Sequence, residues 1–384
     1  MAEASSTIPV STTDPINARI LAISEDRIQG FLPDPFGEIA KRCGVELPTV
    51  VERIVAMLRA GTIRRIRQTL MATNLAQGSL VAWKISAEKL NEGFEYLWKD
   101  DPFSEHIVIR STDRETPGSA YRLWTTLKVP QGFSLAKHCE FLQGQIGSEK
   151  FLLMPAKKLF VLGVGHVRRR TIEPGERADV AADAIGTELV ELSALDWKVL
   201  EALKREFTAE ELDAVAGAGE KFWSSRAAEA GVTLAEFVRV ASSLHERKVI
   251  GRFSTFLEHV KPTSTGEQVT RYNGLFHWAV PKGRELEAGA EVGRHYCMTH
   301  AYWREGGPDF NNVNVMGVVH GTEKDRVLAH KAAIDQHLAE AGIPVSYTNV
   351  FWGGRSEIKP SEISPLAYEA FCRQRGLDPA AMRA

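Results

Sequence analysis

Two pairs of a histidine and an arginine carry the chemistry that this sequence offers. His106 and Arg110 lie in SEHIVIRST, and His300 and Arg304 lie in MTHAYWREG. Within each pair the residues are four positions apart, which places both side chains on one face of a β-strand. Histidine exchanges protons near neutral pH, and the arginine fork binds both oxygens of a carboxylate. The pairs therefore indicate a polar site that handles protons and acidic groups.

The same arrangement occurs twice along the chain. The two histidines are about 194 residues apart, and each pair precedes a short Gly/Pro turn and a second strand, in ETPGSAYRLWTTL and EGGPDFNNVNVMGVV. A repeat of that length is a duplicated domain, because solenoid repeats are far shorter. We therefore expect two copies of one architecture that share a pocket.

The composition is that of an ordinary globular chain. Hydrophobic residues make up 44 % and charged residues 25 % of 384 positions, which allows sizeable cores in roughly two to four domains. A net charge of −2 provides no global attraction to nucleic acid or anionic membrane. The four cysteines form no CxxC or Cys/His cluster, which argues against structural zinc. Without a bilayer-length apolar run or a signal-peptide pattern, we expect a cytoplasmic protein with no membrane partner.

In the first half, hydrophobic spacing predicts three helices, a two-stranded wing and then the order βαββαβ. The helices are expected at 16–28, 35–45 and 47–61, the wing at 62–72, and the βαββαβ elements at 78–85, 86–100, 104–112, 119–129, 133–147 and 149–164. Ser86 is the expected N-cap of the helix at 86–100. Three short helices with a wing are typical of a winged helix-turn-helix, and βαββαβ is typical of a ferredoxin-like domain.

The second half repeats this order after a polar, charged stretch. Helices are expected at 192–207 (capped by Ser193), 221–232 and 233–248, the wing at 249–260, and the βαββαβ elements at 272–281, 284–296, 298–306, 311–321, 324–342 and 345–354. Residues 208–220 form an insertion without a counterpart in the first half. The arginine run 168–170 is expected to be solvated, and the tail after Pro360 is expected to lie as a short helix on the second ferredoxin-like domain.

The predicted fold class is α+β, with a winged helix-turn-helix followed by a ferredoxin-like domain, twice in tandem. The segments are a winged helix at 15–75, a ferredoxin-like domain at 76–165, a linker at 166–190, a second winged helix at 191–262, a second ferredoxin-like domain at 270–360 and a tail at 361–384.

This order resembles the leucine-responsive regulator (Lrp/AsnC) family, and in particular its siroheme decarboxylase branch. That branch has an IRRFGA-type wing ending in a histidine, and a strand S-H-x-Y-x-R before a Pro/Gly turn. The matching wing segments are Ile63–Arg64–Arg65–Ile66 and Ile250–Gly251–Arg252–Phe253, the second ending at His259. The matching strands are Glu105–His106–Ile107–Val108–Ile109–Arg110 and Thr299–His300–Ala301–Tyr302–Trp303–Arg304. The resemblance spans nearly the whole chain and looks like two enzyme subunits fused in tandem.

Departures from the family pattern fall mainly in the first half. Ala72 stands where the second wing has His259, and Val108 stands where the second strand has Tyr302. In the second wing, Gly251 replaces the usual arginine. One working site, built mainly from the second half, is the expected consequence.

The resemblance implies a non-oxidative decarboxylase that removes acetate carboxyl groups from siroheme or a related iron tetrapyrrole in haem or haem d1 biosynthesis. No cofactor beyond the iron of that substrate is implied. His300, His259 and His106 are the expected catalytic residues, as proton donor or iron ligand in an unassigned order, with His300 as the candidate axial ligand of the substrate iron. The expected carboxylate-binding residues are Arg304, Arg110, Arg64, Arg65, Arg252, Tyr302 and Tyr121. Structural roles are expected for His138, His277, His295 and His320.

Two other functions remain open from the sequence. An Lrp/AsnC-type transcriptional regulator needs a recognition helix with base-reading side chains and a basic face. The helices at 47–61 and 233–248 offer few such residues, and two unlike halves lack the identical helices that a palindromic operator requires, so nucleic acid is not the expected partner. A tetrapyrrole-binding protein without catalysis is the other possibility. The single chain is expected to act as a pseudo-dimer, and a further homo-oligomer is left open.

Overall fold

The computed structural model describes residues 8–71, 74–163, 165–186, 188–259 and 261–384, which form two compact units. Each unit combines segments of both halves of the chain. The first unit comprises Met1–Met71, Gly163–Thr171 and Val190–Arg271, and the second comprises Ala72–Leu162, Ile172–Leu189 and Tyr272–Ala384. Within the described ranges, no helix is both long and apolar enough to cross a lipid bilayer.

The first unit packs helices from both halves around a small sheet. Its helices are α1 (Pro15–Ser24), α2 (Pro35–Cys43), α3 (Leu47–Arg59), α6 (His166–Arg169), α7 (Ala194–Lys204), α8 (Ala209–Val215), α9 (Ser224–Glu229) and α10 (Leu234–Glu246). Ser193 caps α7 as expected, in a capping box with Asp196.

The predicted N-cap Ser86 in the second unit was wrong. The helix α4 (Leu90–Lys99) begins after Lys89, where the apolar face formed by Leu90, Phe94 and Leu97 starts.

Each wing segment forms one continuous strand, which corrects the prediction of a two-stranded wing in each half. β2 (Ile63–Leu70) pairs antiparallel with β8 (Ile250–Leu257), and the short β1 (Ile28–Gln29) pairs with the other edge of β8. Residues 62–72 contain no Gly, Pro, Asn or Asp, so nothing favours a hairpin turn there. The backbone groups of each strand are instead satisfied by the strand from the other half.

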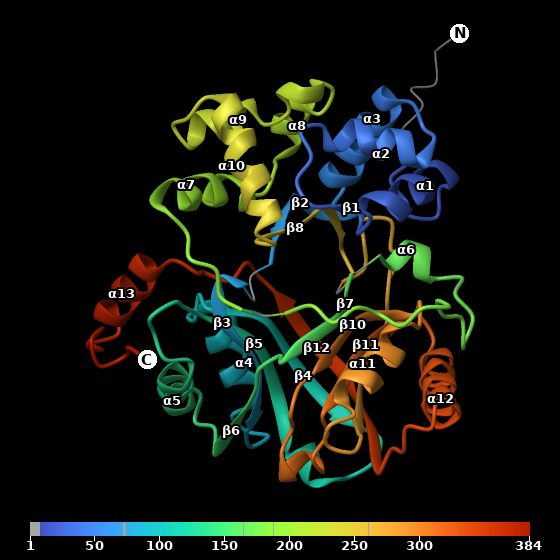
Figure 1. Cartoon of the computed structure of the whole chain (residues 1–384), viewed down its shortest axis with the longest axis vertical. Helices are drawn as coiled ribbons and strands as arrows, with labels where there is room; N and C mark the ends of the chain where they lie inside the picture. Colours follow the sequence, from blue (N-terminus) through green and yellow to red (C-terminus); the bar gives the residue numbers. More distant parts are fainter. Residues whose placement is uncertain (1–7, 72–73, 164, 187, 260) are drawn as a thin grey trace. The chain divides into compact units, whose positions relative to one another are not determined.

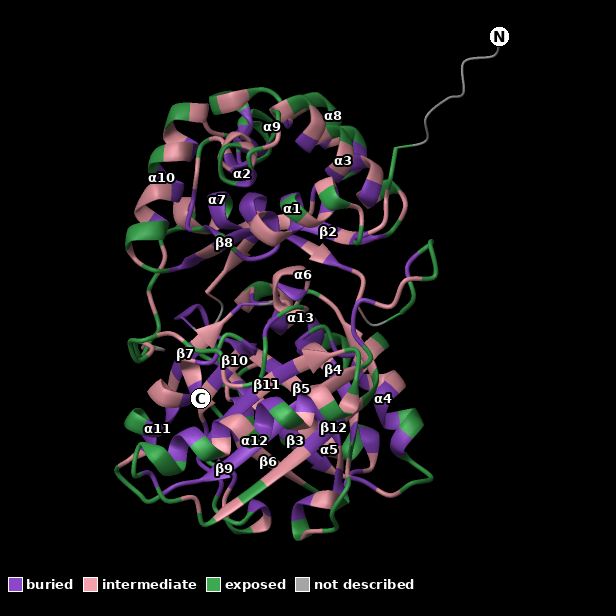
Figure 2. Ribbon diagram, turned by 90° about the vertical axis from the view of Figure 1, so that its right-hand side faces the viewer, coloured by how far each residue is buried: buried purple, intermediate pink, exposed green. Residues whose placement is uncertain are grey.

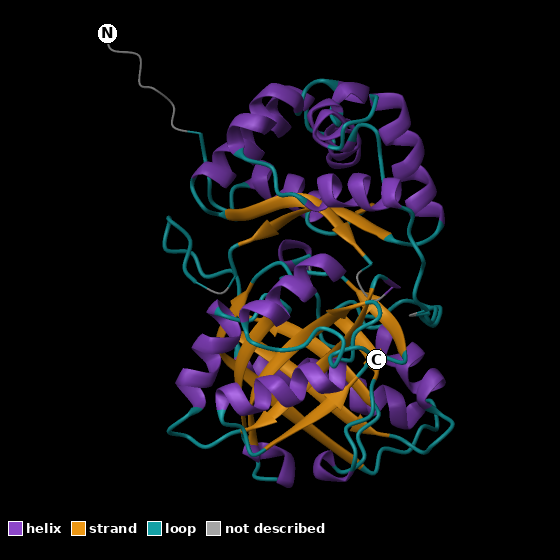
Figure 3. Ribbon diagram, turned by 90° about the vertical axis from the view of Figure 1, so that its left-hand side faces the viewer, coloured by secondary structure: helices purple, strands orange, loops and turns teal. Residues whose placement is uncertain are grey.

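The second unit contains the order βαββαβ twice, in one nine-stranded sheet (Figure 3). The first half supplies β3 (Ala76–Lys84), α4, β4 (Ser104–Thr112), β5 (Tyr121–Pro130), α5 (Leu135–Ile146), β6 (Lys150–Met154) and β7 (Lys158–Leu162). The second supplies β9 (Tyr272–Ala279), α11 (Glu285–Gly293), β10 (Met298–Trp303), β11 (Val315–Gly321), α12 (Lys324–Glu340) and β12 (Tyr347–Ile358). The sheet order is β6-β3-β5-β4-β12-β9-β11-β10-β7, so both halves use the same internal order.

The last strand of each half reaches into the other half. β12 pairs with β9 of its own half over Tyr347–Gly353, and then with β4 over Phe351–Ile358. In the first half a single strand was expected over 149–164, but two strands form: β6 pairs with β3, and β7 pairs with β10. Pro155 lies between β6 and β7, and proline cannot donate to a ladder, which accounts for the break.

This exchange obliges the sheet to curl. β6 and β7 are its two edge strands, yet only residues 155–157 connect them, a chain length that reaches at most about 15 Å. A flat sheet of this many strands would be about 38 Å across. The helices α4, α5 and α13 pack with the first half of the sheet, and α11 and α12 with the second (Figure 1).

A third apolar cluster fills the face of the sheet opposite the helices. It combines side chains of both halves, among them Trp124, Phe351 and Leu275, with Phe310 from the short 3₁₀ turn before β11. We call this surface the inner face. Figure 2 shows a mixture of buried and intermediate residues along the strands of the second unit. The inner face therefore carries an apolar core to which both halves of the chain contribute.

The C-terminal helix packs on the first half of the sheet, which corrects the prediction that it lies on the second. α13 (Pro365–Gln374) buries Tyr368 and Phe371 against Phe103 and His138. The cause is the strand exchange: β12 ends beside β4, so the chain that follows it is delivered to the first half. A backbone hydrogen bond from the Lys359 N–H to the Glu105 carbonyl continues that pairing.

Trp124→Ala is expected to destabilise the second unit by about 3–5 kcal/mol, because it removes a large ring from a core that both halves share. The measurement is the midpoint of urea unfolding followed by circular dichroism. Leu366→Ala, on the exposed side of α13, is the control and should change stability by less than about 0.5 kcal/mol. Equal effects of the two variants would contradict the shared inner core.

Candidate functional site

A row of polar side chains crosses the inner face of the second unit. In directly opposed registers, Arg110 on β4 faces Gly353 on β12, Gly353 faces Asn273 on β9, and Asn273 faces His320 on β11. Each of these positions is two residues from a member of the inner apolar cluster, so all point to the same face. His300 on β10 lies opposite Val318, on that face too. We call these residues, together with Thr299, the polar row.

Hydrogen bonds connect the polar row from one repeat to the other. His300 Nδ1 lies 3.1 Å from Thr299 Oγ1, which lies 3.3 Å from His320 Nδ1. His320 Nε2 lies 3.0 Å from Asn273 Nδ2, and Arg110 donates to Asn273 Oδ1 at 3.4 Å. The second predicted histidine and the first predicted arginine therefore belong to one network. His320 and Asn273 are members that the sequence analysis missed, because their partners in the network are distant in the sequence.

His300, Tyr302 and Arg304 form a stack along β10. The His300 and Tyr302 rings are nearly parallel, with centroids 6.0 Å apart, and the Arg304 guanidinium lies 4.4 Å from the Tyr302 ring centre. These three residues alternate along the strand and share one face, as the spacing predicted. The stack fixes the plane of the His300 ring.

Both predicted strand arginines are buried cations with neutral partners. Arg110 is 5 % exposed and donates to the Phe351 carbonyl at 3.1 Å as well as to Asn273. Arg304 is 8 % exposed and donates to the Met154 carbonyl. Burial lowers the pKa of Arg110 to about 9 and lowers the pKa of Arg304, yet both stay charged at neutral pH. Within the described ranges neither has an acidic partner, and a buried cation in that state favours an anionic ligand.

The remaining predicted residues of the second unit are engaged elsewhere. His106 Nε2 lies 2.8 Å from the Ser356 hydroxyl on β12. The Tyr121 hydroxyl donates to Asp309, and its ring packs on Phe310 in the inner core. Burial, and then the bond to Asp309, raises the pKa of Tyr121.

In the first unit, the predicted Arg64, Arg65 and Arg252 lie on the small sheet, together with Arg67. Arg252 on β8 and Arg67 on β2 lie over the Phe256 ring, at 5.8 and 5.7 Å from its centre. Arg65 forms a 3.3 Å ion pair with Glu206. Burial, followed by the charge of Arg65, lowers the pKa of Arg64 to about 10. Two guanidinium groups of this sheet therefore lie over one aromatic ring, and Arg64 and Arg65 lie on the neighbouring strand.

His259 lies in a histidine pair that the sequence did not indicate. Its ring stacks on His166, with centroids 4.7 Å apart and an interplanar angle of 25°. His166 Nδ1 lies 3.1 Å from the buried carboxylate of Glu25, and the His259 Nδ1–H donates to the Leu257 carbonyl at 3.2 Å. Ala72, the first-half counterpart of His259, lies outside the described residues.

The arginine run that follows His166 is structural, which corrects its assignment as solvated linker. Arg168 donates two bonds of 2.9 Å to Asp26, and Arg169 donates a third of 3.0 Å. Burial alone would raise the pKa of Asp26, but these arginines and the Gly165 N–H hold it well below its usual range. The carboxylates of Glu25 and Asp26 thus anchor α6 within the first unit.

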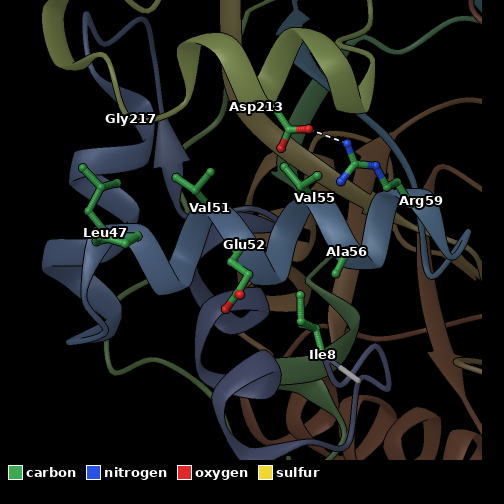
Figure 4. A pocket seen from close by; sticks show the side chains of 10 residues that line it. Ile8, Leu47, Val51, Glu52, Val55, Ala56, Arg59, Asp213 and Gly217 are labelled. Atoms are coloured by element: carbon green, nitrogen blue, oxygen red, sulfur yellow. Dashed lines mark hydrogen bonds and ion pairs between the residues drawn. The ribbon is translucent and has the colours of Figure 1, made fainter. Parts of the chain in front are cut away.

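A pocket of about 510 Å³ lies in the first unit, away from all predicted residues (Figure 4). Val51 and Val55 of α3 line it, and an ion pair between Arg59 and Asp213 borders it. No group of three His, Cys, Asp or Glu side chains in the part of the chain that the structure describes could hold a metal ion.

Solved structures share this architecture. The siroheme decarboxylase NirDL matches with a TM-score of 0.63 at 17 % identity, covering 93 % of this chain and 97 % of that chain. NirDL in complex with an iron-uroporphyrin III analogue matches with a TM-score of 0.61 at 18 % identity, covering 94 % and 97 %. At these identities the matches show the fold, a mixed α+β architecture.

One curated relative matches by sequence. The siroheme decarboxylase of Hydrogenobacter thermophilus (strain DSM 6534 / IAM 12695 / TK-6) is 22 % identical over 311 residues, which cover 80 % of this chain and 84 % of the relative. No protein-family model matches the chain. The chain is thus similar to siroheme decarboxylases in sequence and in fold.

His277, on β9 beside the polar row, gives the second unit a distinct acid sensitivity. Its ring is 0 % exposed, and burial, followed by the charges of Arg110 and Lys331, lowers its pKa to about 3. Between pH 6.5 and 3, His277 binds a proton in the unfolded chain but stays neutral in the folded chain. The free energy of unfolding therefore decreases as the pH falls through this window.

On going from pH 7 to pH 5, the free energy of unfolding should therefore fall by about 2 kcal/mol less in His277→Leu than in the unmodified protein. Urea unfolding at both pH values measures the difference. Phe351→Leu, at the ring that packs on His277, is the control and should weaken the protein equally at both pH values. If the stability of His277→Leu depends on pH as strongly as that of the unmodified protein, the buried neutral histidine is not the cause of this pH dependence.

Proposed function

We propose that this chain is a decarboxylase, a carbon–carbon lyase, which acts on the acetate side chains of siroheme or a closely related iron tetrapyrrole. The observation that carries the proposal is the match to a siroheme decarboxylase over 80 % of this chain and 84 % of the relative. The matching fold of NirDL, which has a structure with an iron-uroporphyrin III analogue, supports it. The alternative functions do not have comparable support.

The proposal includes a tandem Lrp/AsnC-type architecture. The repeated βαββαβ order and the identical strand order in both halves support two ferredoxin-like copies. The helices and crossed strands of the first unit would be the corresponding pair of winged helices, modified because each strand pairs with the opposite half. One chain would then do what two subunits do elsewhere in the family, as a pseudo-dimer in the cytoplasm.

The residues suit a flat, polyanionic substrate that contains iron. Arg110 and Arg304 are buried cations whose internal partners are neutral carbonyl and amide oxygens, so substrate carboxylates would supply the missing charge. Arg252 and Arg64, with Arg65, would bind further carboxylates from the first unit, and Tyr302 would support the imidazole next to it. Histidine is a common ligand for haem iron, which suits His300.

The reaction needs carboxylate binding and a proton. Loss of CO₂ from an acetate side chain leaves negative charge that the conjugated ring of the substrate delocalises. A proton must then reach the new methyl carbon, and a histidine that titrates near neutrality can deliver it. His300 and His259 are the residues proposed for this transfer or for ligation of the substrate iron, and no further cofactor is proposed.

The candidate recognition helices argue against a DNA-binding regulator. On α3, Arg53 pairs with Asp14 and Arg59 with Asp213, and on α10 Arg239 lies 3.7 Å from Glu236. Cations already paired with carboxylates neutralise few phosphates. These helices therefore present a poor surface for the nucleic-acid backbone.

Purified protein should bind siroheme with a shift of the Soret band and convert it, without oxygen, to a product lacking acetate carboxyl groups. Absorption titration measures binding, and mass spectrometry of the extracted tetrapyrrole measures decarboxylation. Binding without conversion would indicate a carrier. No binding, combined with sequence-dependent retention of DNA at physiological salt, would indicate a regulator.

The two halves should contribute unequally. His300→Ala and His259→Ala are expected to lower kcat by about 10²–10⁴-fold, the usual contribution of a general acid or base, whereas His106→Ala should cost much less because His106 Nε2 is bonded to Ser356. Single-turnover decarboxylation with the three variants measures this. Equal losses would show two working sites or a composite site.

A further inference from the structure

We infer that Thr299, His320 and Asn273 are positioning residues that hold His300 with its proton on Nδ1 and its lone pair on Nε2. The inference rests on the proposed function for its chemical meaning, but the tautomer itself is a property of the protein alone. Sequence reasoning left open which nitrogen of His300 meets the substrate. The polar row decides it.

The Thr299 hydroxyl sets the direction of the network. It donates its single hydrogen to the Val318 carbonyl at 2.9 Å, an oxygen that can only accept. Thr299 Oγ1 can therefore only accept from the ring nitrogens at 3.1 Å in His300 and 3.3 Å in His320. Both Nδ1 atoms must carry hydrogen.

The hydrogen bonds at the Arg110 end of the polar row also require the His320 proton to be on Nδ1. An arginine has only donors, so Arg110 donates to Asn273 Oδ1 and orients the amide. The Asn273 Nδ2 group then donates to His320 Nε2 at 3.0 Å, which must be a lone pair. A neutral His320 with its proton on Nδ1 satisfies both neighbours.

For His300, the consequence is a defined reactive nitrogen. With Nδ1–H committed to Thr299 and the ring plane held by Tyr302, neutral His300 presents the Nε2 lone pair. That atom can ligate the substrate iron, or hold and return the proton that the proposed reaction needs. Histidines that ligate a metal often donate their other ring N–H to a carboxylate. In His300 the Thr299 hydroxyl takes that place.

Polar and charged groups approach His300 from its own strand and from the polar row. Along its own strand these are Tyr302 and Arg304, and along the polar row they are His320 and Arg110. The facing strand β7 presents Leu162 opposite His300. On the Nδ1 side, the Thr299 hydroxyl of the polar row lies 3.1 Å from the ring nitrogen.

At the described positions of the first half that correspond to Thr299, His320 and Asn273, other residues are present. Glu105, which corresponds to Thr299, pairs with Lys128, and Lys128 occupies the position that corresponds to His320. Gly78 lies opposite Lys128, where Asn273 lies opposite His320. His106 instead uses its Nε2 for Ser356. Only one of the two repeated histidines is positioned in this way.

The test compares Thr299→Val, which removes the acceptor with little change of shape, with Thr299→Ser, which keeps it. Thr125→Val is the matched control, because Thr125 is also a fully buried strand threonine that accepts a ring N–H, from Trp83. Nitrogen-15 spectra of histidine-labelled protein without substrate report the tautomer of His300. We expect the Nδ1–H form in the unmodified protein, in Thr299→Ser and in Thr125→Val, and its partial replacement by the Nε2–H form in Thr299→Val.

With siroheme, Thr299→Val should lower kcat by about 10–100-fold, the usual cost of losing such a partner, and Thr299→Ser should restore most of it. A Nε2–H tautomer in the unmodified protein, or a Thr299→Val variant indistinguishable from Thr125→Val, would overturn the inference. If siroheme is not converted at all, the proposed function fails while the spectra still decide the tautomer.

Discussion

The pairing of each half's last strand with the other half is the interaction on which the second unit depends. β12 continues from its own β9 onto β4, and the chain of β6 continues as β7 onto β10. Because these pairings satisfy the backbone groups that would otherwise form sheet edges, neither repeat is complete alone. The common inner core, the place of α13 and the polar row all follow from this exchange.

The exchange also brings together polar groups that are far apart in sequence. Arg110 and Asn273 can meet only because β12 lies between β4 and β9, and only because the residue between them is Gly353. A Cβ atom there would lie 3.2 Å from Asn273 Cβ, tighter than an ordinary contact, and any larger side chain would separate the two groups. The absence of a side chain at one position thus permits a hydrogen bond across three strands.

Buried charge is treated differently in the two units. In the first, Asp26 balances Arg168 and Arg169, and Glu25 accepts hydrogen bonds from His166 and Val167, so these carboxylates hold α6 in place. In the second, Arg110 and Arg304 have neutral oxygens as partners. Since uncompensated buried charge is costly, the second arrangement is the one expected of a site that awaits an anion.

The sequence by itself determined the repeated βαββαβ order, the shared face of each His–Arg pair and the Ser193 cap, because strand period and capping are local properties. It also determined the resemblance that led to the proposed reaction. Strand partners were decided only by tertiary structure: β2 with β8, β12 with β4 and α13 on the first half follow from non-local hydrogen bonding that no local pattern encodes. For the same reason the sequence did not distinguish His320 and His166 from structural histidines. His320 contacts Thr299, 21 residues away, and His166 contacts Glu25, 141 residues away.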